Sequence, residues 1–317
     1  MSNILYLVIP CYNEEDVLPQ TAVQVEKKMT SLMESNIISP DSKVLFIDDG
    51  STDETWSMIR QLYDENKLFT AIRLAHNSGE QNAYFAGMMT AVEHADVIIT
   101  IDADLQDDIN AVDDMLRAYS EGYEIVYGVR ASRKNESFFI RATAALFYKL
   151  MKILGTELIP NHSQYRLMSR RAVLALADYG EVNLFLPALV PLLGFKNTKV
   201  YHERIPRTEG RSKYSVKRLF LLAIQAITSF SLAPIRLLNW VGVLFLLVAA
   251  GLAVFSIVRA VTGQTTGWLW VLSSVWAVGG MTVLSLGVAG EYVGKTYVES
   301  KRRPRYIIQE NLNDDFS

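Results

Sequence analysis

Short apolar runs rich in β-branched residues recur along the first half of the chain, and segments with helical spacing separate them. The apolar runs predict strands at 5–9, 44–47, 71–74, 97–101 and 125–128. The intervening segments predict helices that include 17–33, 56–63 and 83–92. Strands that alternate with helices favour an α/β fold with a parallel sheet covered on both faces. Ligands bind such sheets beyond the carboxyl ends of the strands, so we expect the functional site at that edge.

Two long uncharged stretches, 240–258 and 260–290, distinguish the last third of the chain. Each is long enough to cross a bilayer core, which takes about 20 apolar residues. A buried helix of a soluble protein rarely stays apolar all round for that length. We therefore expect a two-helix transmembrane hairpin. Residues 217–234 are expected to form an amphipathic helix in the membrane interface, with a third span as the alternative.

Charge is divided unevenly along the chain. Residues 1–206 carry 19 Lys and Arg against 28 Asp and Glu, whereas residues 207–317 carry 12 against 6. Basic residues flank the expected spans, with Arg236 before the first span and Lys295 and Lys301 after the second, so the positive-inside rule places both ends in the cytoplasm. The N-terminus lacks the basic start and length of a signal peptide. We expect a two-span protein of the cell membrane with a cytoplasmic N-terminal domain.

These features predict four parts of the chain. They are a cytoplasmic domain at 1–206, a juxtamembrane loop and interface helix at 207–234, the transmembrane hairpin at 235–295, and a basic cytoplasmic tail at 296–317.

Polar clusters follow three of the predicted strands directly, at 11–15, 48–53 and 102–107. Because the carboxyl ends of parallel strands meet at one edge of the sheet, the three clusters should lie together. The third cluster contains Asp102, Asp104 and Gln106, whose oxygens suit a hard divalent cation that keeps sites for water and phosphate. This composition indicates an enzyme that acts on a phosphorylated donor. The alternative is an acidic turn that caps the following helix.

Asp48 and Asp49 are adjacent at the end of a predicted buried strand. Neighbouring carboxylates repel each other, and a ligand or a cation would relieve that repulsion. Part of this cluster could be structural, because Ser51 and Glu54 have the spacing of a capping box and Asp53 suits a helix N-terminus.

Six segments, taken in order, resemble the family 2 glycosyltransferases. The closest resemblance is to the polyprenyl-phosphate glycosyltransferases, the group of dolichol-phosphate mannose synthase and bactoprenol glucosyltransferase. The segments are VIPCYNEE at 8–15, DDGSTD at 48–53, NSGEQNA at 77–83, DADLQD at 102–107, YRLMSRRA at 165–172 and EGRSKYS at 209–215. The resemblance implies a Rossmann-like domain with a parallel sheet that binds a nucleotide sugar, followed by interface helices and the hairpin.

The same resemblance implies roles for individual residues. The nucleotide sugar would be held by Pro10, Tyr12, Glu14, Asp49, Gly79, Asp102 and Ala103, and by Arg207, Arg211 and Lys213 of a loop that closes over phosphates. Asp102, Asp104 and Gln106 would hold Mg²⁺ or Mn²⁺, and Asp104, Gln164 and Arg166 would act in catalysis. Arg130 and Arg133 would grip the acceptor phosphate, with a solvated charged surface as the alternative.

The implied reaction moves a sugar, glucose as the first choice, from a nucleoside-diphosphate sugar to undecaprenyl phosphate with inversion of the anomeric centre. A UDP-sugar is the expected donor class, and UDP-GlcNAc, UDP-galactose and GDP-mannose stay open as alternatives to UDP-glucose. The expected partners are this donor, a polyprenyl phosphate lipid and the membrane. No nucleic-acid partner is expected, and a homo-oligomer is left open.

One residue departs from the family pattern. Relatives usually carry aspartate where this chain has Gln164, and glutamine neither takes a proton nor carries charge. If the family aspartate is a base, Gln164→Asp should raise turnover. The alternative function is a catalytically weakened or silent membrane scaffold that binds nucleotide sugars. A processive polysaccharide synthase is disfavoured, because the chain has no Arg-Trp pair and two spans do not enclose a polymer.

Overall fold

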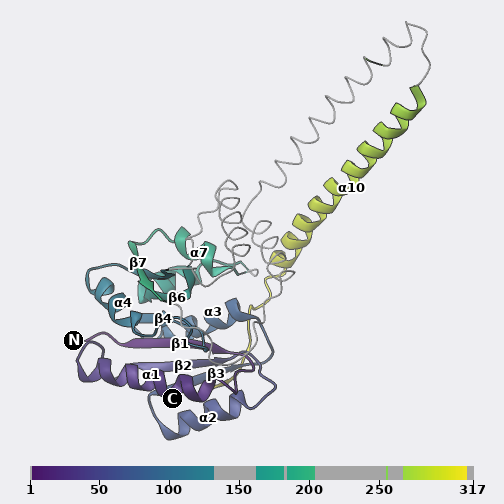
Figure 1. Cartoon of the computed structure of the whole chain (residues 1–317). Coiled ribbons are helices and arrows are strands. Elements are labelled where there is room, and N and C mark those ends of the chain that lie inside the picture. The colour runs from purple at the N-terminus through teal and green to yellow at the C-terminus, as the bar shows by residue number, and fades with distance from the viewer. Residues whose placement is uncertain (1, 132–161, 182–183, 204–254, 256–266, 313–317) are drawn as a thin grey trace. The chain divides into compact units, whose positions relative to one another are not determined.

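The structure is a computed structural model of the whole chain and describes residues 2–131, 162–181, 184–203, 255 and 267–312 (Figure 1). The chain forms two compact units. The first contains the described residues up to 203 and those from Arg303 onward, and the second contains helix α10 (Gly267–Ser300). The predicted division into four parts stays a prediction.

An eight-stranded sheet with the order β7-β5-β6-β4-β1-β2-β3-β8 forms the first unit. Its strands are β1 (Leu5–Cys11), β2 (Lys43–Asp48), β3 (Phe69–Leu74), β4 (Val97–Thr100), β5 (Ile125–Arg130), β6 (His162–Ser169), β7 (Asn197–His202) and β8 (Ile308–Asn311). The helices of this unit are α1 (Leu18–Glu34), α2 (Thr55–Glu65), α3 (Glu80–Ala91), α4 (Ala111–Ser120), α6 (Arg170–Ala177) and α7 (Leu186–Leu192). The five predicted strands and three predicted helices are confirmed, each end to within three residues.

The sheet is mixed, which corrects the expectation of a parallel sheet. Strands β4, β1, β2 and β3 run parallel to one another, and β5 and β7 are parallel to each other. Strand β6, however, lies antiparallel between β4 and β5, and β8 lies antiparallel on β3. Strand β6 lacks the continuous apolar run that identified the others, because polar Gln164 and Arg166 alternate with buried Tyr165 and Leu167. Such alternation is typical of an antiparallel strand.

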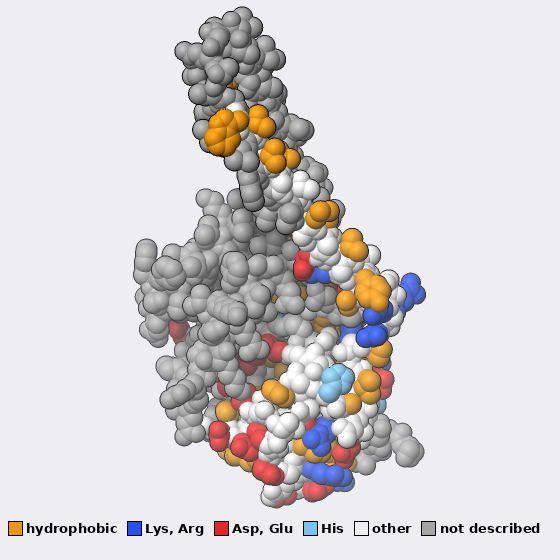
Figure 2. Space-filling view, turned by 90° about the vertical axis from the view of Figure 1, so that its right-hand side faces the viewer, with side chains coloured by type: hydrophobic (Ala, Val, Ile, Leu, Met, Phe, Trp, Pro, Cys, Tyr) orange, Lys and Arg blue, Asp and Glu red, His pale blue; other side chains and the backbone are white. Residues whose placement is uncertain are grey.

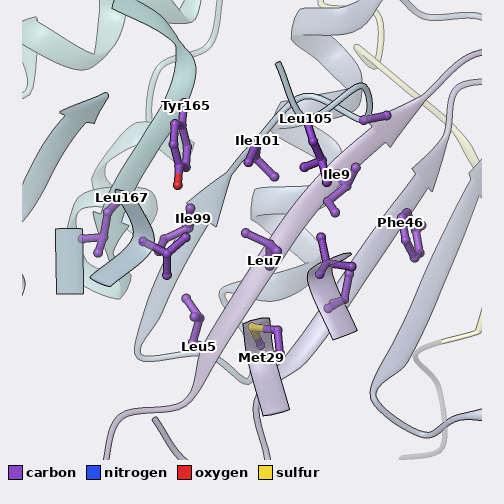
Figure 3. Close-up of a cluster of buried hydrophobic side chains, with 14 of the residues drawn as sticks. Leu5, Leu7, Ile9, Met29, Phe46, Ile99, Ile101, Leu105, Tyr165 and Leu167 are labelled. Carbon is purple, nitrogen blue, oxygen red and sulfur yellow. The ribbon is translucent and has the colours of Figure 1, made fainter. Parts of the chain in front are cut away.

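A cluster of buried hydrophobic side chains packs on one face of the sheet. Alternate residues of β1, Leu5, Leu7 and Ile9, pack in one cluster with Met29 of α1 (Figure 3). The cluster extends to Leu105 in the loop after β4, so the loop that carries the acidic motif is part of the core. On the opposite face of the sheet, α3 packs against β1, β2 and β4, and α6 packs against β6.

Helix α3 approaches the sheet closely at Gly87. A Cβ atom there would lie 2.6 Å from both Val8 Cγ1 and Ile47 Cδ1, so Gly87→Ala would overpack the interface. We expect this variant to lower the free energy of unfolding by about 1–3 kcal/mol, measured by urea denaturation. Gly180→Ala is the matched control, because a Cβ at Gly180 meets nothing within 4 Å. Equal stability of the two variants would contradict the expected overpacking.

The predicted capping box is wrong. Helix α2 begins at Thr55 with Glu54 as its N-cap, and the Glu54 side chain forms no capping hydrogen bond. Asp53 does suit the helix N-terminus, as expected, because its Oδ1 accepts a hydrogen bond from the Thr55 N–H at 3.1 Å. The Ser51 hydroxyl instead accepts a hydrogen bond from the backbone N–H of Asn13, at 3.0 Å, and so connects two loops.

In the part of the chain that the structure describes, no helix combines the length and the apolar character needed to cross a membrane. The predicted transmembrane hairpin therefore gains no support from the described residues. The interface helix expected at 217–234 and, apart from Phe255, the first span expected at 240–258 lie outside those residues.

Candidate active site

The loops that follow β1 and β2 form one hydrogen-bonded platform. Asn13, which has a φ of 53°, accepts a hydrogen bond on Oδ1 from the N–H of Thr52 at 2.9 Å, and its own N–H donates to Ser51. Glu14 N–H donates to Thr55 Oγ1 at 2.9 Å, and Glu15 accepts from Glu54 N–H at 2.9 Å. The first and second polar clusters are therefore together, as the sequence predicted, and each orders the other. Tyr12 and Glu14 are at the surface of this platform, beside Pro10.

Asp48 and Asp49 point to different partners within the protein. Asp48 is fully buried and forms an ion pair with Arg73, whose Nε lies 3.1 Å from Oδ2. Asp49 accepts hydrogen bonds from the N–H groups of Ser78 at 2.7 Å and Gly79 at 3.0 Å. Burial raises the pKa of both carboxyl groups. Groups of the protein therefore stabilise the two adjacent carboxylates, whereas from the sequence a ligand or a cation is expected to relieve their repulsion.

Two glycines allow the β2 and β3 loops to meet. Gly50 has a φ of 69°, and a Cβ there would lie 2.7 Å from the carbonyl carbon of His76. Gly79 has a φ of 90° at the N-cap of α3, a conformation that other residues rarely adopt. The predicted donor residues Asp49 and Gly79 are therefore in direct contact at the beginning of α3.

Asp102 follows β4 and lies beside α3. Its Oδ1 accepts a hydrogen bond from the hydroxyl of Tyr84, which is fully buried. Burial, followed by the negative charges of Glu80, Asp107 and Asp104, raises the pKa of Asp102 to about 7. No cationic side chain among the described residues forms an ion pair with Asp102. Asp102 therefore differs from Asp48, which has Arg73 as an ion-pair partner, because Arg130 and Arg166 act on Asp102 through their charge without forming an ion pair.

The rest of the acidic loop is a tight, anchored turn. Leu105 is buried and has a φ of 43°, and its N–H donates to the carbonyl of Asp102 at 3.2 Å. Asp104 Oδ1 accepts from the N–H of Gln106 at 3.2 Å, and Gln106 is itself buried. The buried Ala103 offers its carbonyl to the hydroxyl of Thr21 on α1. A backbone held in this way keeps its side chains in place when a ligand binds.

Arg130 is committed to a partner inside the protein. Its Nε lies 2.9 Å from Asp107 Oδ1 and its Nη2 lies 3.3 Å from Asp107 Oδ2, a bidentate pair. Burial alone would lower the pKa of Arg130, but the Asp107 carboxylate outweighs it and raises that pKa. His202 of β7 lies 3.8 Å from the same carboxylate. The acceptor role of Arg130 stays a prediction. Arg133, Arg207, Arg211 and Lys213 lie outside the described residues.

Gln164 and Arg166 share one face of β6. The guanidinium of Arg166 donates from Nη2 to Gln164 Oε1, and the Gln164 carbonyl accepts from the hydroxyl of Thr100 on β4. Arg166 is fully buried, and within the described part of the chain its Nη1 has no hydrogen-bond partner. Burial lowers the pKa of Arg166 to about 10. Because β6 pairs with β4 through Thr100 and Arg166, this cation lies beside the strand that precedes Asp102.

The donor atoms of the acidic loop fit a hard divalent cation. Asp102 and Asp104 supply carboxylates and Gln106 an amide, which is the oxygen chemistry that Mg²⁺ and Mn²⁺ accept. Among the described residues there is no group of three or more His, Cys, Asp or Glu side chains that could hold a metal ion. The remaining ligands of such a cation would come from phosphate and water.

Sequence reasoning missed Arg73 and Tyr84. Arg73 could have been found, because it is a charged residue in the otherwise apolar strand that follows the two adjacent aspartates. Tyr84 carries no comparable signal, because an aromatic residue within a buried helix is usually a core residue.

Comparisons with known proteins agree with this geometry. A family profile described as glycosyl transferase family 2 matches residues 6–176. An "Uncharacterized glycosyltransferase YkoT" of Bacillus subtilis (strain 168) is 43% identical over 313 residues, 98% of this chain and 93% of that protein. A "Bactoprenol glucosyl transferase" of Shigella phage SfV is 33% identical over 309 residues, 96% and 97% of the two chains. Mannosyl-3-phosphoglycerate synthase from Rubrobacter xylanophilus shares the fold, with a TM-score of 0.50 at 15% identity over 76% and 75% of the two chains.

Proposed function

Because the chain belongs to glycosyltransferase family 2, we propose that it transfers a sugar from a nucleoside-diphosphate sugar to the phosphate of a polyprenyl lipid. UDP-glucose is the proposed donor and undecaprenyl phosphate the proposed acceptor. The similarity over nearly the full chain to a bactoprenol glucosyl transferase supports this choice. UDP-GlcNAc, UDP-galactose and GDP-mannose are the donors against which it must be tested.

The observation that best supports this function is that the Asp102 carboxylate is held in place but has no ion-pair partner among the described side chains. The carboxylate is oriented by Tyr84, surrounded by the charges of Glu80 and Asp104, and without an ion pair to a described cationic side chain. A folded protein normally compensates such a group, as Arg73 does for Asp48. A divalent cation bound at this carboxylate, with water or donor phosphate oxygens as its remaining ligands, would supply the positive charge that an ion pair supplies to Asp48.

Asp102, Asp104 and Gln106 are the residues that would hold this Mg²⁺ or Mn²⁺. When bound, the cation would neutralise charge on the departing nucleoside diphosphate as a Lewis acid. The platform formed by residues 10–15 and 48–55 is the proposed site for the nucleoside, next to Asp49 and Gly79.

The acceptor needs alignment more than it needs a strong base. A phosphate monoester has a second pKa near ~6 and is largely dianionic at neutral pH. One of its oxygens forms the new bond to the anomeric carbon while the bond from that carbon to the diphosphate breaks, which inverts the centre. Two anions must therefore approach each other. The buried guanidinium of Arg166 on β6 carries a positive charge that would reduce the repulsion between these two anions.

Gln164→Asp tests the role of this position. A carboxylate there would face the Arg166 guanidinium, which holds the pKa of a carboxyl group low and makes it a weak base. We therefore expect turnover to rise by less than about tenfold, through better orientation, whereas a general base contributes about 10²–10⁴-fold. Steady-state kcat is the measurement, with Gln164→Asn as the uncharged control of equal size. A rise above a hundredfold would establish a base role.

We also propose that the second unit associates with the membrane, where the lipid acceptor resides. Figure 2 shows hydrophobic side chains spaced along α10. The exposed ones are Trp268, Val271, Val275, Val278, Leu286, Val293, Tyr297 and Val298. The uncharged sequence at 240–258 and the basic residues after α10 support a membrane hairpin with a cytoplasmic catalytic unit. Co-sedimentation of the chain with liposomes of anionic lipid tests this placement.

The function is tested with the purified full chain, undecaprenyl phosphate in detergent and a panel of labelled nucleotide sugars. We expect label from UDP-glucose to enter the organic phase with Mg²⁺ and to stay in the aqueous phase with EDTA. Transfer that is unaffected by EDTA would overturn the metal-dependent mechanism. Label from a different donor would correct the sugar.

Two controls separate catalysis from binding. Asp114→Asn alters an exposed carboxylate on α4 that pairs with Arg117, and it should leave transfer unchanged. Binding of the nucleotide sugar by isothermal titration calorimetry, without transfer to any acceptor, would support the silent scaffold instead. The absence of Asp at position 164 is the feature that keeps this second function open.

A further inference from the structure

The hydroxyl of Tyr84 donates a hydrogen bond to Oδ1 of Asp102 across the interface between α3 and the end of β4. We propose that Tyr84 is a positioning residue that holds the Asp102 carboxylate in the orientation in which it binds a divalent cation. This inference rests on the proposed function, because that function places the cation on Asp102.

The hydrogen bond uses one of the two carboxylate oxygens. Among the described residues, no donor forms a hydrogen bond with the other oxygen, Oδ2. An aspartate side chain rotates about two bonds, and one directional bond to a rigid donor selects among its orientations. Residues that orient metal ligands in this way typically change metal affinity by about 10–100-fold when they are removed.

Tyr84 can act as a rigid donor because α3 is held on three sides. The N-terminus of the helix is fixed by the hydrogen bonds from Ser78 and Gly79 to Asp49. Its inner face lies against the sheet at Gly87, where the approach leaves no room for a Cβ. Tyr84 itself is fully buried on this helix.

The third contact comes from the C-terminal part of the first unit. The Arg305 guanidinium lies 4.4 Å from the centre of the Phe85 ring, and Tyr306 packs edge-on against the same ring at 6.3 Å. Arg305 also donates to the carbonyl of Tyr179, so α3 is held from outside through Phe85. Residues from three distant parts of the sequence thus fix the helix that carries the hydroxyl.

A purely structural role for Tyr84 makes a different prediction. As a core residue, Tyr84 would contribute mainly the burial of its ring, which phenylalanine retains. Tyr84→Phe would then change metal affinity no more than another buried tyrosine does. Tyr6 of β1 is that matched control, because it is 3% exposed and its ring stacks on His94 rather than on the acidic loop.

The experiment is a titration of the purified full chain with Mn²⁺ alone, followed by electron paramagnetic resonance, for the parent, Tyr84→Phe and Tyr6→Phe. We expect Tyr84→Phe to bind Mn²⁺ about 10–100-fold more weakly and Tyr6→Phe to bind it like the parent. Thermal midpoints of all three proteins establish that the comparison is between folded chains.

A kinetic measurement provides the second readout. In the transfer assay, Tyr84→Phe should raise the Mg²⁺ concentration needed for half-maximal rate, while the rate at saturating Mg²⁺ stays within a few fold of the parent. Equal Mn²⁺ affinity of Tyr84→Phe and the parent, or equal weakening by both tyrosine variants, would overturn the positioning role. Failure of the parent to bind Mn²⁺ would instead overturn the metal-dependent function itself.

Discussion

Asp102→Asn is expected to abolish most sugar transfer and, at pH 8, to make the metal-free protein more stable. Asparagine keeps an oxygen that can accept the Tyr84 hydrogen bond but removes the charge that a cation needs. Loss of one group that stabilises developing charge lowers kcat by about 10²–10³-fold. The stability gain arises because the folded protein buries a carboxylate that has no ion-pair partner among the described side chains.

The sign of the pH dependence follows from the pKa of Asp102, which rises from 3.8 when unfolded to about 7 when folded. A raised pKa means that the stability contribution is fully present below 3.8 and is lost as the pH rises through 7. At pH 8 the charged group therefore costs on the order of 2–4 kcal/mol, which asparagine avoids. Urea denaturation without divalent cations should show a large gain for the variant at pH 8 and a smaller gain at pH 5. A gain that is equal at both pH values would contradict this origin.

Arg73→Met is expected to destabilise the first unit by about 3 kcal/mol at pH 8, because it leaves Asp48 buried without its ion pair. Methionine retains most of the apolar volume of the arginine stem beside Trp56, so the loss of charge dominates. The partial exposure of Arg73 keeps the expected effect at the lower end of the range for buried pairs. Urea denaturation measures it.

A double-mutant cycle provides the control for Arg73→Met. Asp48→Asn alone removes the buried charge, and Arg73→Met should cost much less in that background. The cost of Arg73→Met in the parent should also shrink at pH 5, because burial raises the pKa of Asp48 and protonation removes the unpaired charge. Equal costs in both backgrounds would mean that Arg73 stabilises the loop through contacts other than Asp48.

Asp48 and Asp102 show that one sequence feature, an aspartate at the end of a buried strand, can have either a structural or a functional role. Both lie at or just after the end of a buried strand and both belong to an acidic cluster, so their sequence signals are alike. Arg73 on β3 neutralises Asp48 and makes it structural, whereas the neighbour of Asp102 is a neutral tyrosine on α3. This difference indicates that the cluster around Asp102, and not the one around Asp48, needs a ligand with positive charge.

Much of the parallel half of the sheet could be predicted, because its strands are continuous apolar runs with local turn signals. Strand β6 could not be predicted in this way, since Gln164 and Arg166 interrupt the apolar pattern. Its position is decided by pairing with β4 and β5, both of which lie far from it in the chain. The hydrogen bond from Thr100 of β4 to the Gln164 carbonyl could therefore be identified only in the folded protein.

The amino-acid sequence by itself determined that three polar clusters end neighbouring strands, because strand period and strand ends are local properties of the chain. It also determined the family, through the order and spacing of its motifs, and the family profile matches residues 6–176. Only the tertiary structure decided which charges are compensated and which are not. Arg73, Tyr84 and Arg166 come from separate elements, and the electrostatics of each aspartate depends on which of them packs beside it.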